Sequence, residues 1–407
     1  MNKTTGHIIE TVLTIALLAV MLAGLGKLCR NKNSYGKYNE FYKYAGDYDV
    51  LFCGSSHMMN MALPMELWKE YGIRSYNIGN GAETIPITYH VLKNALDATS
   101  PKIVVMDVFY SYSNHKVPDV SIEMPHQYFD LVPLSNDKAA AVFDLFDEDR
   151  DRWNYLYDFS VYHNRWSELN AGDIIPADEG LGGARILLES YSPQDETFDP
   201  PKLHEMASVP KEYLTKIKEM CNDRGIRLIC VVNPYAMWQE NGTGNVDYEK
   251  EMESLGIEFV DLRESDVVDM AADCADNMHL NIGGQRKITN RYGQILLETG
   301  LLPDYTNADN SEWGRRYEAY VDKKAEFLGM CDNCSSLLTD LNDPAFEFDI
   351  EYREDAPFDK AQKKMLDNAS DNKNVRISTN NAIDADIIIS VRRTGESSCF
   401  IKKSFDL

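Results

Sequence analysis

Short apolar runs alternate with helix-like segments between residues 48 and 305 of this chain. The runs at 49–54, 101–110 and 226–234 are almost continuously apolar, which is typical of strands buried on both faces. Further strand-like runs span 74–78 and 257–262. The helical patterns that separate and follow these runs span residues 64–72, 87–98, 210–225, 247–256 and 283–300. Repeating strand–helix units predict an α/β fold, in which helices cover both faces of a central parallel sheet.

The N-terminal 29 residues contain a long apolar segment. From Ile8 to Leu25 the chain has 18 residues that are apolar except for Glu10 and two threonines. This length is near the lower limit for a helix that spans a bilayer. We expect an uncleaved membrane anchor over residues 1–29. A signal peptide and the buried helix of a soluble protein are the alternatives, and MLAGLG is only a partial match to a cleavage site.

A polar segment rich in Tyr and Lys follows at residues 30–47 and is predicted to form a stem between the membrane and the α/β domain. Lys3 precedes the apolar segment, and four basic residues follow it before residue 38. Positive charges accumulate on the cytoplasmic side of membrane helices, so this distribution by itself predicts a cytoplasmic domain.

Three further regions flank or interrupt the strand–helix pattern. Residues 115–200 are irregular and rich in Asp, Tyr, Trp and Pro, which indicates an insertion over the core. Residues 306–334 form a charged, helical linker. Residues 335–407 contain four strand-like runs and one helical stretch, which predict a small α+β module without a catalytic pattern.

The composition restricts the possible partners. Lys and Arg total 41 against 65 Asp and Glu, a net charge of −24. Nucleic-acid binding needs clustered basic side chains, so we do not expect that function. Among eight cysteines only Cys331 and Cys334 are closely spaced; they match a redox pair or half of a zinc site, but no second pair completes such a site. We therefore expect no metal and no cofactor.

Two segments far apart in the sequence carry residues suited to nucleophilic catalysis. Ser55 and Ser56 follow the first predicted strand, and ligands of parallel sheets bind at the carboxyl ends of the strands. Asp276 and His279 stand three residues apart, immediately before the last long helix. An acid at this spacing can hold one imidazole nitrogen while the other accepts a proton from a serine. An ordinary turn serine and a capped helix start are the alternatives.

This ordered set resembles the SGNH (GDSL-like) hydrolase superfamily over residues 48–303. The resemblance implies a flavodoxin-like three-layer sandwich with Ser56 as the nucleophile; Ser55 stands where the family usually has Asp. It also implies that Asp276 and His279 complete the triad. The family's second block corresponds to Asn77-Ile78-Gly79, so Gly79 is expected to form the oxyanion hole together with the backbone of Ser56.

The third block departs from the family pattern. A Gly-x-Asn-Asp run is expected after the third strand, whereas this chain has MDVFYSYSN, and Asn114 is the candidate for the missing oxyanion donor. His57 follows the proposed nucleophile, and we interpret it as a partly exposed loop or capping residue.

The Gly-Ser-Ser-His sequence, the N-terminal anchor and the appended module resemble a membrane-tethered subset of this superfamily. It comprises proteins of D-alanine transfer to teichoic acids and of polysaccharide O-acetylation. The resemblance implies an extracytoplasmic esterase or O-acyltransferase, contrary to the flanking charges. It further implies an acylated polysaccharide or teichoic-acid-like polymer as substrate and a multi-spanning membrane O-acyltransferase as partner. The alternative is a weakly active or inactive scaffold that binds the polymer or that partner.

Overall fold

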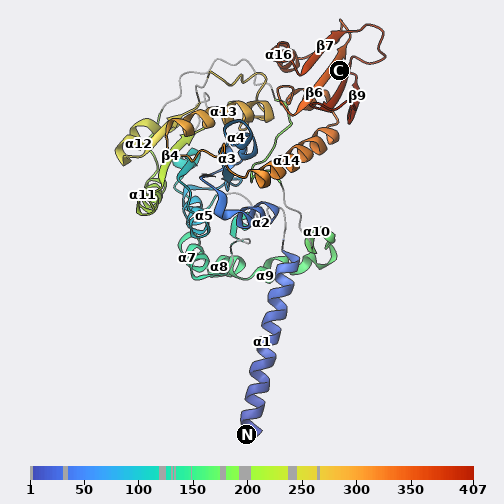
Figure 1. Ribbon diagram of the computed structural model, residues 1–407. Helices are drawn as coiled ribbons and strands as arrows, with labels where there is room; N and C mark the ends of the chain where they lie inside the picture. Colours follow the sequence, from blue (N-terminus) through green and yellow to red (C-terminus); the bar gives the residue numbers. More distant parts are fainter. Residues whose placement is uncertain are drawn as a thin grey trace.

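The computed structural model describes residues 3–30, 35–118, 125–129, 132, 134–147, 149–174, 180–191, 203–236, 245–263 and 266–407. An α/β domain forms the centre of the molecule, a second sheet lies at one end, and helix α1 extends from the other end (Figure 1). These features confirm the predicted fold class.

The central sheet has five parallel strands in the order β2-β1-β3-β4-β5. Their bounds are Val50–Cys53 (β1), Ser75–Asn77 (β2), Ile103–Asp107 (β3), Arg227–Val232 (β4) and Glu258–Asp261 (β5). All residues of β1, β2 and β3 are buried, because helices cover the sheet on both sides. This strand order is that of flavodoxin-like folds, and it brings the ends of β1 and β3 together.

Successive residues of β1 belong to two different core layers. Leu51 and Cys53 lie in one apolar cluster, whereas Val50 and Phe52 lie in another, as the two-residue period of a strand requires. The first cluster includes residues of α5 (Ile85–Ala98), α11 (Ser208–Asp223) and α12 (Tyr248–Leu255). The second includes residues of α3 (Ser56–Met59), α4 (Pro64–Tyr71) and α13 (Ile282–Glu298). The result is the predicted helix–sheet–helix sandwich.

The segment predicted as a stem is part of the core instead. Residues 35–43 form helix α2 (Tyr35–Lys43), a 3-10 turn η1 (Ala45–Asp47) follows, and the side chains of Lys37, Tyr38 and Phe41 are buried. The Tyr76 hydroxyl of β2 donates to the Lys37 carbonyl. The Tyr and Lys content that suggested a solvated spacer serves to pack and hydrogen-bond this helix against the sheet, so the stem prediction is corrected for these residues.

The described part of the insertion is helical between residues 126 and 174, whereas residues 180–191 form an irregular segment. After η2 (Phe109–Tyr112) it contains α6 (His126–Phe129), α7 (Asn136–Leu145), α8 (Asp149–Leu156), α9 (Asp158–Tyr162), η3 (His163–Ser167) and α10 (Ala171–Ile174). Figure 1 shows α7, α8, α9 and α10 in a row at the end of the domain from which α1 emerges. Residues 119–124, 175–179 and 192–200 of the predicted insertion lie outside the described residues.

Helix α1 (Lys3–Cys29) is exposed over most of its length. Within its span Thr5–Cys29, the most apolar window of 18 residues has a mean hydropathy of 2.4, and none of that window is buried. The length and composition of this helix meet the criteria for a membrane-spanning helix. An N-terminal signal sequence meets the same criteria.

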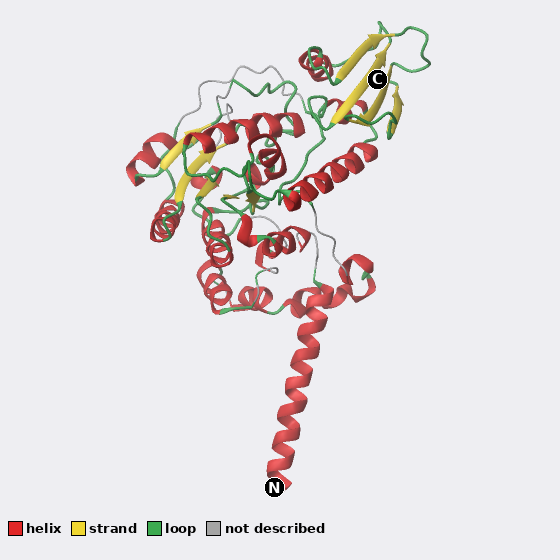
Figure 2. Ribbon diagram, in the orientation of Figure 1, coloured by secondary structure: helices red, strands yellow, loops and turns green. Residues whose placement is uncertain are grey.

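The C-terminal region begins with α14 (Ser311–Met330) and α15 (Cys334–Leu338). A four-stranded sheet follows, separate from the central sheet, in the order β7-β6-β8-β9 (Figure 2). Its elements are β6 (Phe346–Tyr352), α16 (Lys360–Ala369), β7 (Val375–Thr379), β8 (Ile387–Arg393) and β9 (Ile401–Phe405). β6 and β7 are parallel because α16 connects them, whereas the other pairs are antiparallel.

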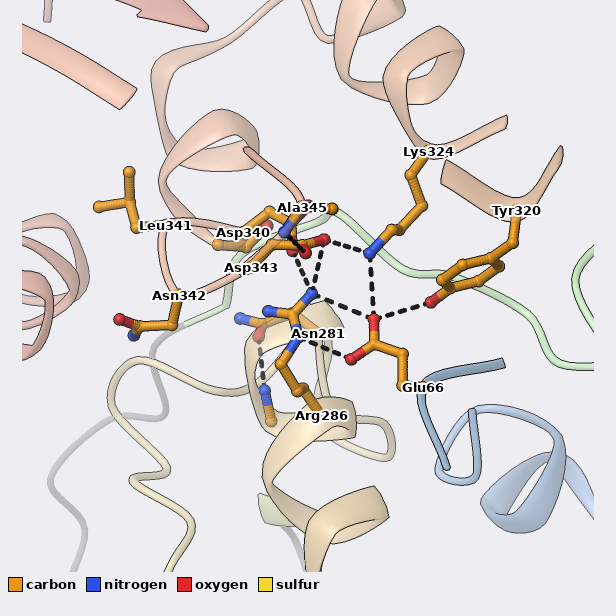
Figure 3. Close-up of polar contacts among 12 residues, drawn as sticks. Glu66, Asn281, Arg286, Tyr320, Lys324, Asp340, Leu341, Asn342, Asp343 and Ala345 are labelled. Carbon is orange, nitrogen blue, oxygen red and sulfur yellow. Dashed lines mark hydrogen bonds and ion pairs between the residues drawn. The ribbon is translucent and has the colours of Figure 1, made fainter. Parts of the chain in front are cut away.

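A buried charge cluster connects this region to the α/β domain (Figure 3). The Arg286 guanidinium of α13 donates to Glu66 of α4 at 2.8 Å and to Asp340 at 2.7 Å. Lys324 of α14 donates to Glu66 at 3.1 Å and pairs with Asp343. Because buried charges must be paired, these contacts fix α14 and the segment before β6 against α4 and α13.

Candidate active site

The turn between β1 and α3 determines where Ser56 lies. Gly54 has a φ of +126°, and a Cβ at this position would lie 2.8 Å from the Cβ of Asp107, so only glycine fits here. Ser55 caps α3: its Oγ accepts from the His57 N–H at 3.2 Å and donates to Asp107 Oδ2 at 2.6 Å. Ser56 is therefore the first residue of a short helix at the carboxyl end of a buried strand.

Three predicted residues meet at this point. The Nε2 atom of His279 lies 2.9 Å from the Ser56 Oγ, although 223 positions separate the two residues in the chain. The Nδ1 atom of His279 lies 2.9 Å and 3.1 Å from the two carboxylate oxygens of Asp276. An ionised carboxylate only accepts hydrogen bonds, so Nδ1 carries the proton and Nε2 is left to accept from the serine hydroxyl.

The loop before α13 holds the acid and the imidazole in this arrangement. Asp276 Oδ1 accepts from the backbone N–H groups of Met278 at 2.7 Å and His279 at 2.8 Å. Burial raises the pKa of this carboxyl, but the hydrogen bonds from the imidazole and from the backbone outweigh burial and hold the pKa below its usual value. Asp276 is therefore ionised at neutral pH. Asn281, two residues after His279, caps α13 by accepting from the Gly284 N–H at 3.2 Å.

Asp107 is a supporting residue that sequence reasoning missed. Its carboxylate accepts from Ser55 Oγ and, at 3.2 Å, from the Phe109 N–H. Burial raises its pKa to about 6, although both hydrogen bonds act in the opposite direction. Asp107, at the end of β3, thus provides a carboxylate beside Ser55. An acidic residue at the carboxyl end of a buried parallel strand is the signal by which the sequence could have revealed it.

The structure does not place Gly79 in the pocket. Its N–H donates to Asn77 Oδ1 at 3.0 Å, and its carbonyl accepts from Lys37. An N–H already bonded to a neighbouring side chain does not bind an oxyanion, so the prediction for this glycine is corrected. Gly81 and Ala82 of the same loop line the pocket instead, and Ala82 has a φ of +52°.

Asn114 also lies away from the nucleophile. Its Oδ1 atom accepts from the Ser208 hydroxyl at 3.2 Å and from the Val209 N–H at 3.1 Å, at the start of α11. The loop after β3 does not fold back, because η2 carries the chain away and presents Phe109 and Tyr110 to the pocket. The predicted third oxyanion donor is thus a residue that caps a helix.

His57 differs from its interpretation as a partly exposed residue. It is 1% exposed, and its ring stacks on Phe109 with centroids 4.0 Å apart. Among the described residues neither ring nitrogen has a hydrogen-bond partner. Burial and the neighbouring His279 lower the pKa of His57 to about 3, so this imidazole is neutral. It forms part of the pocket wall, beside the His279 ring at a centroid distance of 5.5 Å.

The pocket above Ser56 has a volume of about 510 Å³ and is open to solvent. Aromatic rings form one wall, and the exposed residues Arg185 and Glu189 also line the pocket.

In the described part of the chain no group of His, Cys, Asp and Glu is suited to hold a metal. Cys331 and Cys334 are buried, and burial raises the thiol pKa to about 11 and about 12, respectively. Their thiols are therefore protonated at neutral pH.

No protein-family model and no curated protein matches this sequence. Several solved structures of GDSL-like acylhydrolases and acetylxylan esterases are similar to it. A GDSL-like lipase from Bacteroides thetaiotaomicron has 11% identity over 65% of this chain and 99% of its own, with a TM-score of 0.33. A catalytic mutant of an acetylxylan esterase from Geobacillus stearothermophilus has 13% identity over 61% and 94%, with a TM-score of 0.31. The assignment of the site rests on its own geometry.

Proposed function

We propose that this protein is a serine acyl-ester hydrolase or O-acyltransferase of the SGNH type. The observation that carries the proposal is the line of contacts from Ser56 Oγ through His279 to the Asp276 carboxylate. These three side chains supply a nucleophile, a general base and an orienting acid, each within hydrogen-bond distance of the next.

In the first step Ser56 Oγ attacks the ester carbonyl carbon while His279 Nε2 takes the hydroxyl proton. The tetrahedral intermediate then collapses, the ester C–O bond breaks, and the imidazolium gives its proton to the departing alcohol. Water or a sugar hydroxyl next attacks the acyl carbon while His279 Nε2 takes its proton; the bond from the acyl carbon to Ser56 Oγ then breaks, and the imidazolium returns the proton to Oγ. Transfer and hydrolysis thus differ only in which hydroxyl reaches the acyl carbon.

The developing oxyanion needs hydrogen-bond donors beside Ser56. The Ser56 N–H stands in the first turn of α3, where backbone N–H groups have no acceptor within the helix. We assign the second donor to the backbone at Gly81, which lines the pocket. In the SGNH family an Asn of the third block is a further oxyanion donor. This chain has no such Asn beside Ser56, so its oxyanion hole has one donor fewer, and we expect slow turnover.

The pocket and the resemblance to the membrane-tethered subset support a proposal for the substrate class. The partly exposed Tyr110 ring is able to pack against a sugar ring, and Arg185 and Glu189 are able to bind hydroxyl groups. We propose an acylated cell-envelope polysaccharide or teichoic-acid-like polymer as substrate, with α1 as a membrane anchor and the catalytic domain outside the cytoplasm. A membrane O-acyltransferase is the proposed partner.

The position of Asn114 at the start of α11, away from Ser56, favours a second candidate function. This is a scaffold that does not turn over substrate and that binds the same polymer or partner. An experiment on the full chain in detergent separates the two functions. A fluorophosphonate probe labels the enzyme but not Ser56→Ala or His279→Ala, whereas Ser398→Ala, a change at an exposed serine of the C-terminal sheet region, labels normally. A burst of p-nitrophenol from its acetate ester accompanies labelling. Equal labelling of Ser56→Ala overturns the assignment, and absence of both signals in the unmodified chain establishes the scaffold.

A further inference from the structure

The insertion exposes an unusual set of large apolar side chains. We name the following residues the insertion face: Leu134, Phe143, Trp153, Tyr157, Trp166 and Ile174. Trp166 is 73% exposed, Ile174 69%, Trp153 65% and Phe143 57%. Exposed tryptophans are rare on soluble surfaces, and a concentration of such residues in one region marks a surface that contacts a partner or a membrane.

The insertion is attached directly to the end of α1. The Arg165 guanidinium donates to the backbone carbonyls of Cys29 at 2.8 Å and Arg30 at 2.9 Å, where α1 ends. It also contacts the Asp173 carboxylate of α10 at 3.3 Å. Cys29 is buried against this part of the insertion, unlike the apolar residues earlier in α1. The next residue in the chain after Arg165 is the exposed Trp166, so this indole lies beside the point where the apolar helix leaves the domain.

The helices that carry the other members of the face lie at the same end of the molecule. Figure 1 shows α7, α8, α9 and α10 in a row at the end of the domain from which α1 emerges. On α7 the buried residues Ala141, Val142 and Leu145 face the domain. Phe143 points away from that core and meets the Arg152 side chain of α8, 5.0 Å from the ring centroid. The exposed side of this row is therefore turned away from the central sheet.

We propose that the insertion face lies in the headgroup layer of the same bilayer that α1 spans. This inference rests on the anchoring part of the proposed function. Continuity with α1 selects lipid as the occupant, because a bilayer around the apolar helix begins where that helix leaves the domain. Trp and Tyr favour this layer, since their rings are apolar and their N–H or O–H groups remain hydrated.

The charge of the surroundings defines the kind of lipid. Asp137 in the first turn of α7 pairs with Lys93, and Glu168, directly after η3, pairs with Arg165, so these acidic side chains are compensated. The proposed contact rests on the aromatic and aliphatic side chains rather than on attraction to anionic lipid. Zwitterionic phosphatidylcholine suffices, and added salt has little effect.

The test uses the full chain reconstituted into phosphatidylcholine vesicles whose acyl chains carry bromine, a quencher of tryptophan emission at short range. Emission is expected to fall by up to about two fifths, the share of Trp153 and Trp166 among five tryptophans. The double variant Trp153→Phe/Trp166→Phe loses this quenching. Trp68→Phe, a change in α4 and outside the insertion face, retains it.

A flotation assay after an alkaline wash reports on the anchor independently. If the chain floats but emission is unquenched, or if the double variant is quenched like the parent chain, the insertion face does not contact lipid. If a cross-linked dimer forms through Trp153→Cys or Trp166→Cys without quenching, a second copy covers the face instead. If the chain does not float, the anchor fails and the proposal falls with it, whereas fluorophosphonate labelling of Ser56 is unaffected.

Discussion

In the proposed mechanism His279 acts on Ser56 directly, whereas Asp276 acts only through the imidazole. The ordered motifs and their resemblance to the SGNH superfamily suggested these three residues, and the structure brings their side chains within hydrogen-bond distance of one another. Gly79 and Asn114 were wrong as oxyanion donors, since the direction of a loop N–H or amide depends on neighbours that are distant in sequence.

We expect Asp276→Asn to lower kcat by about 10²- to 10⁴-fold with little change in KM, because the neutral amide no longer fixes the imidazole tautomer. Ester hydrolysis by purified protein measures both constants. Asp332→Asn, at an exposed position outside the site, serves as the control and retains full activity. A kcat close to that of the parent chain would show that His279 is oriented by other groups.

A second residue-scale prediction concerns stability against pH. Glu83 is buried beside Asn80, which donates to it at 2.6 Å, and burial raises its pKa from 4.5 to about 8. Between these values the folded chain keeps a proton that the unfolded chain releases. Stability therefore falls as pH rises through this window, by up to about 1.4 kcal/mol per pH unit from this group.

Melting temperatures of the full chain in detergent at pH 5.5 and pH 8 measure this effect. Glu83→Gln removes the titrating group and keeps a similar shape, so its melting temperature is expected to fall less between the two pH values. The same fall in the variant and in the parent chain would exclude Glu83 as the source.

At the scale of elements, the helices and strands agree closely with the sequence pattern, including β6 to β9 and α16. Apolar periodicity and glycine stops are local signals, and tertiary packing reinforces them here. Helix α2 was missed because its polar residues match a solvated spacer. Its burial depends on partners such as Tyr76 and Gly79, which lie in β2 and the following loop.

The charge cluster between α4, α13 and α14 leads to a prediction about how these elements are held. Arg286→Met removes one of two cations that face Glu66, Asp340 and Asp343. Asp340 then loses its ion-pair partner, and Glu66 and Asp343 share Lys324 alone. We therefore expect a loss of about 3–5 kcal/mol in the free energy of unfolding. Urea unfolding of the full chain in detergent measures this loss.

Arg291→Met on the same helix is the matched control, because that side chain is only partly buried and its described hydrogen bond goes to a neutral partner, Gln294. Its effect is expected to stay within about 0.5 kcal/mol. Similar values for the two variants would mean that the cluster adds no net stability beyond its packing.

At the scale of the whole molecule, the end of α1 contacts the insertion, whereas α2 packs against the central sheet. We expect a chain that begins at residue 31 to fold and to leave the membrane fraction on gentle washing. A chain that begins at residue 48 lacks the buried Phe41 and Tyr38, and removing a buried aromatic side chain costs about 3–5 kcal/mol. It is expected to aggregate or to melt at a much lower temperature, as circular dichroism would show. Equal melting temperatures would mean that α2 is dispensable.

The sequence by itself determined the α/β class and the order along the chain of most strands and helices, which depend on periodicity, on caps and on short spacings. It also suggested Ser56, His279 and Asp276 as candidates, through the resemblance of their ordered motifs to the SGNH superfamily. Only the tertiary structure decided which loop backbone borders the pocket, that Asp107 supports Ser55, and that His57 is buried against Phe109. It also decided that α2 belongs to the core. The physical reason is that burial and hydrogen-bond partners come from segments up to hundreds of residues apart, and no local pattern records which of them meet.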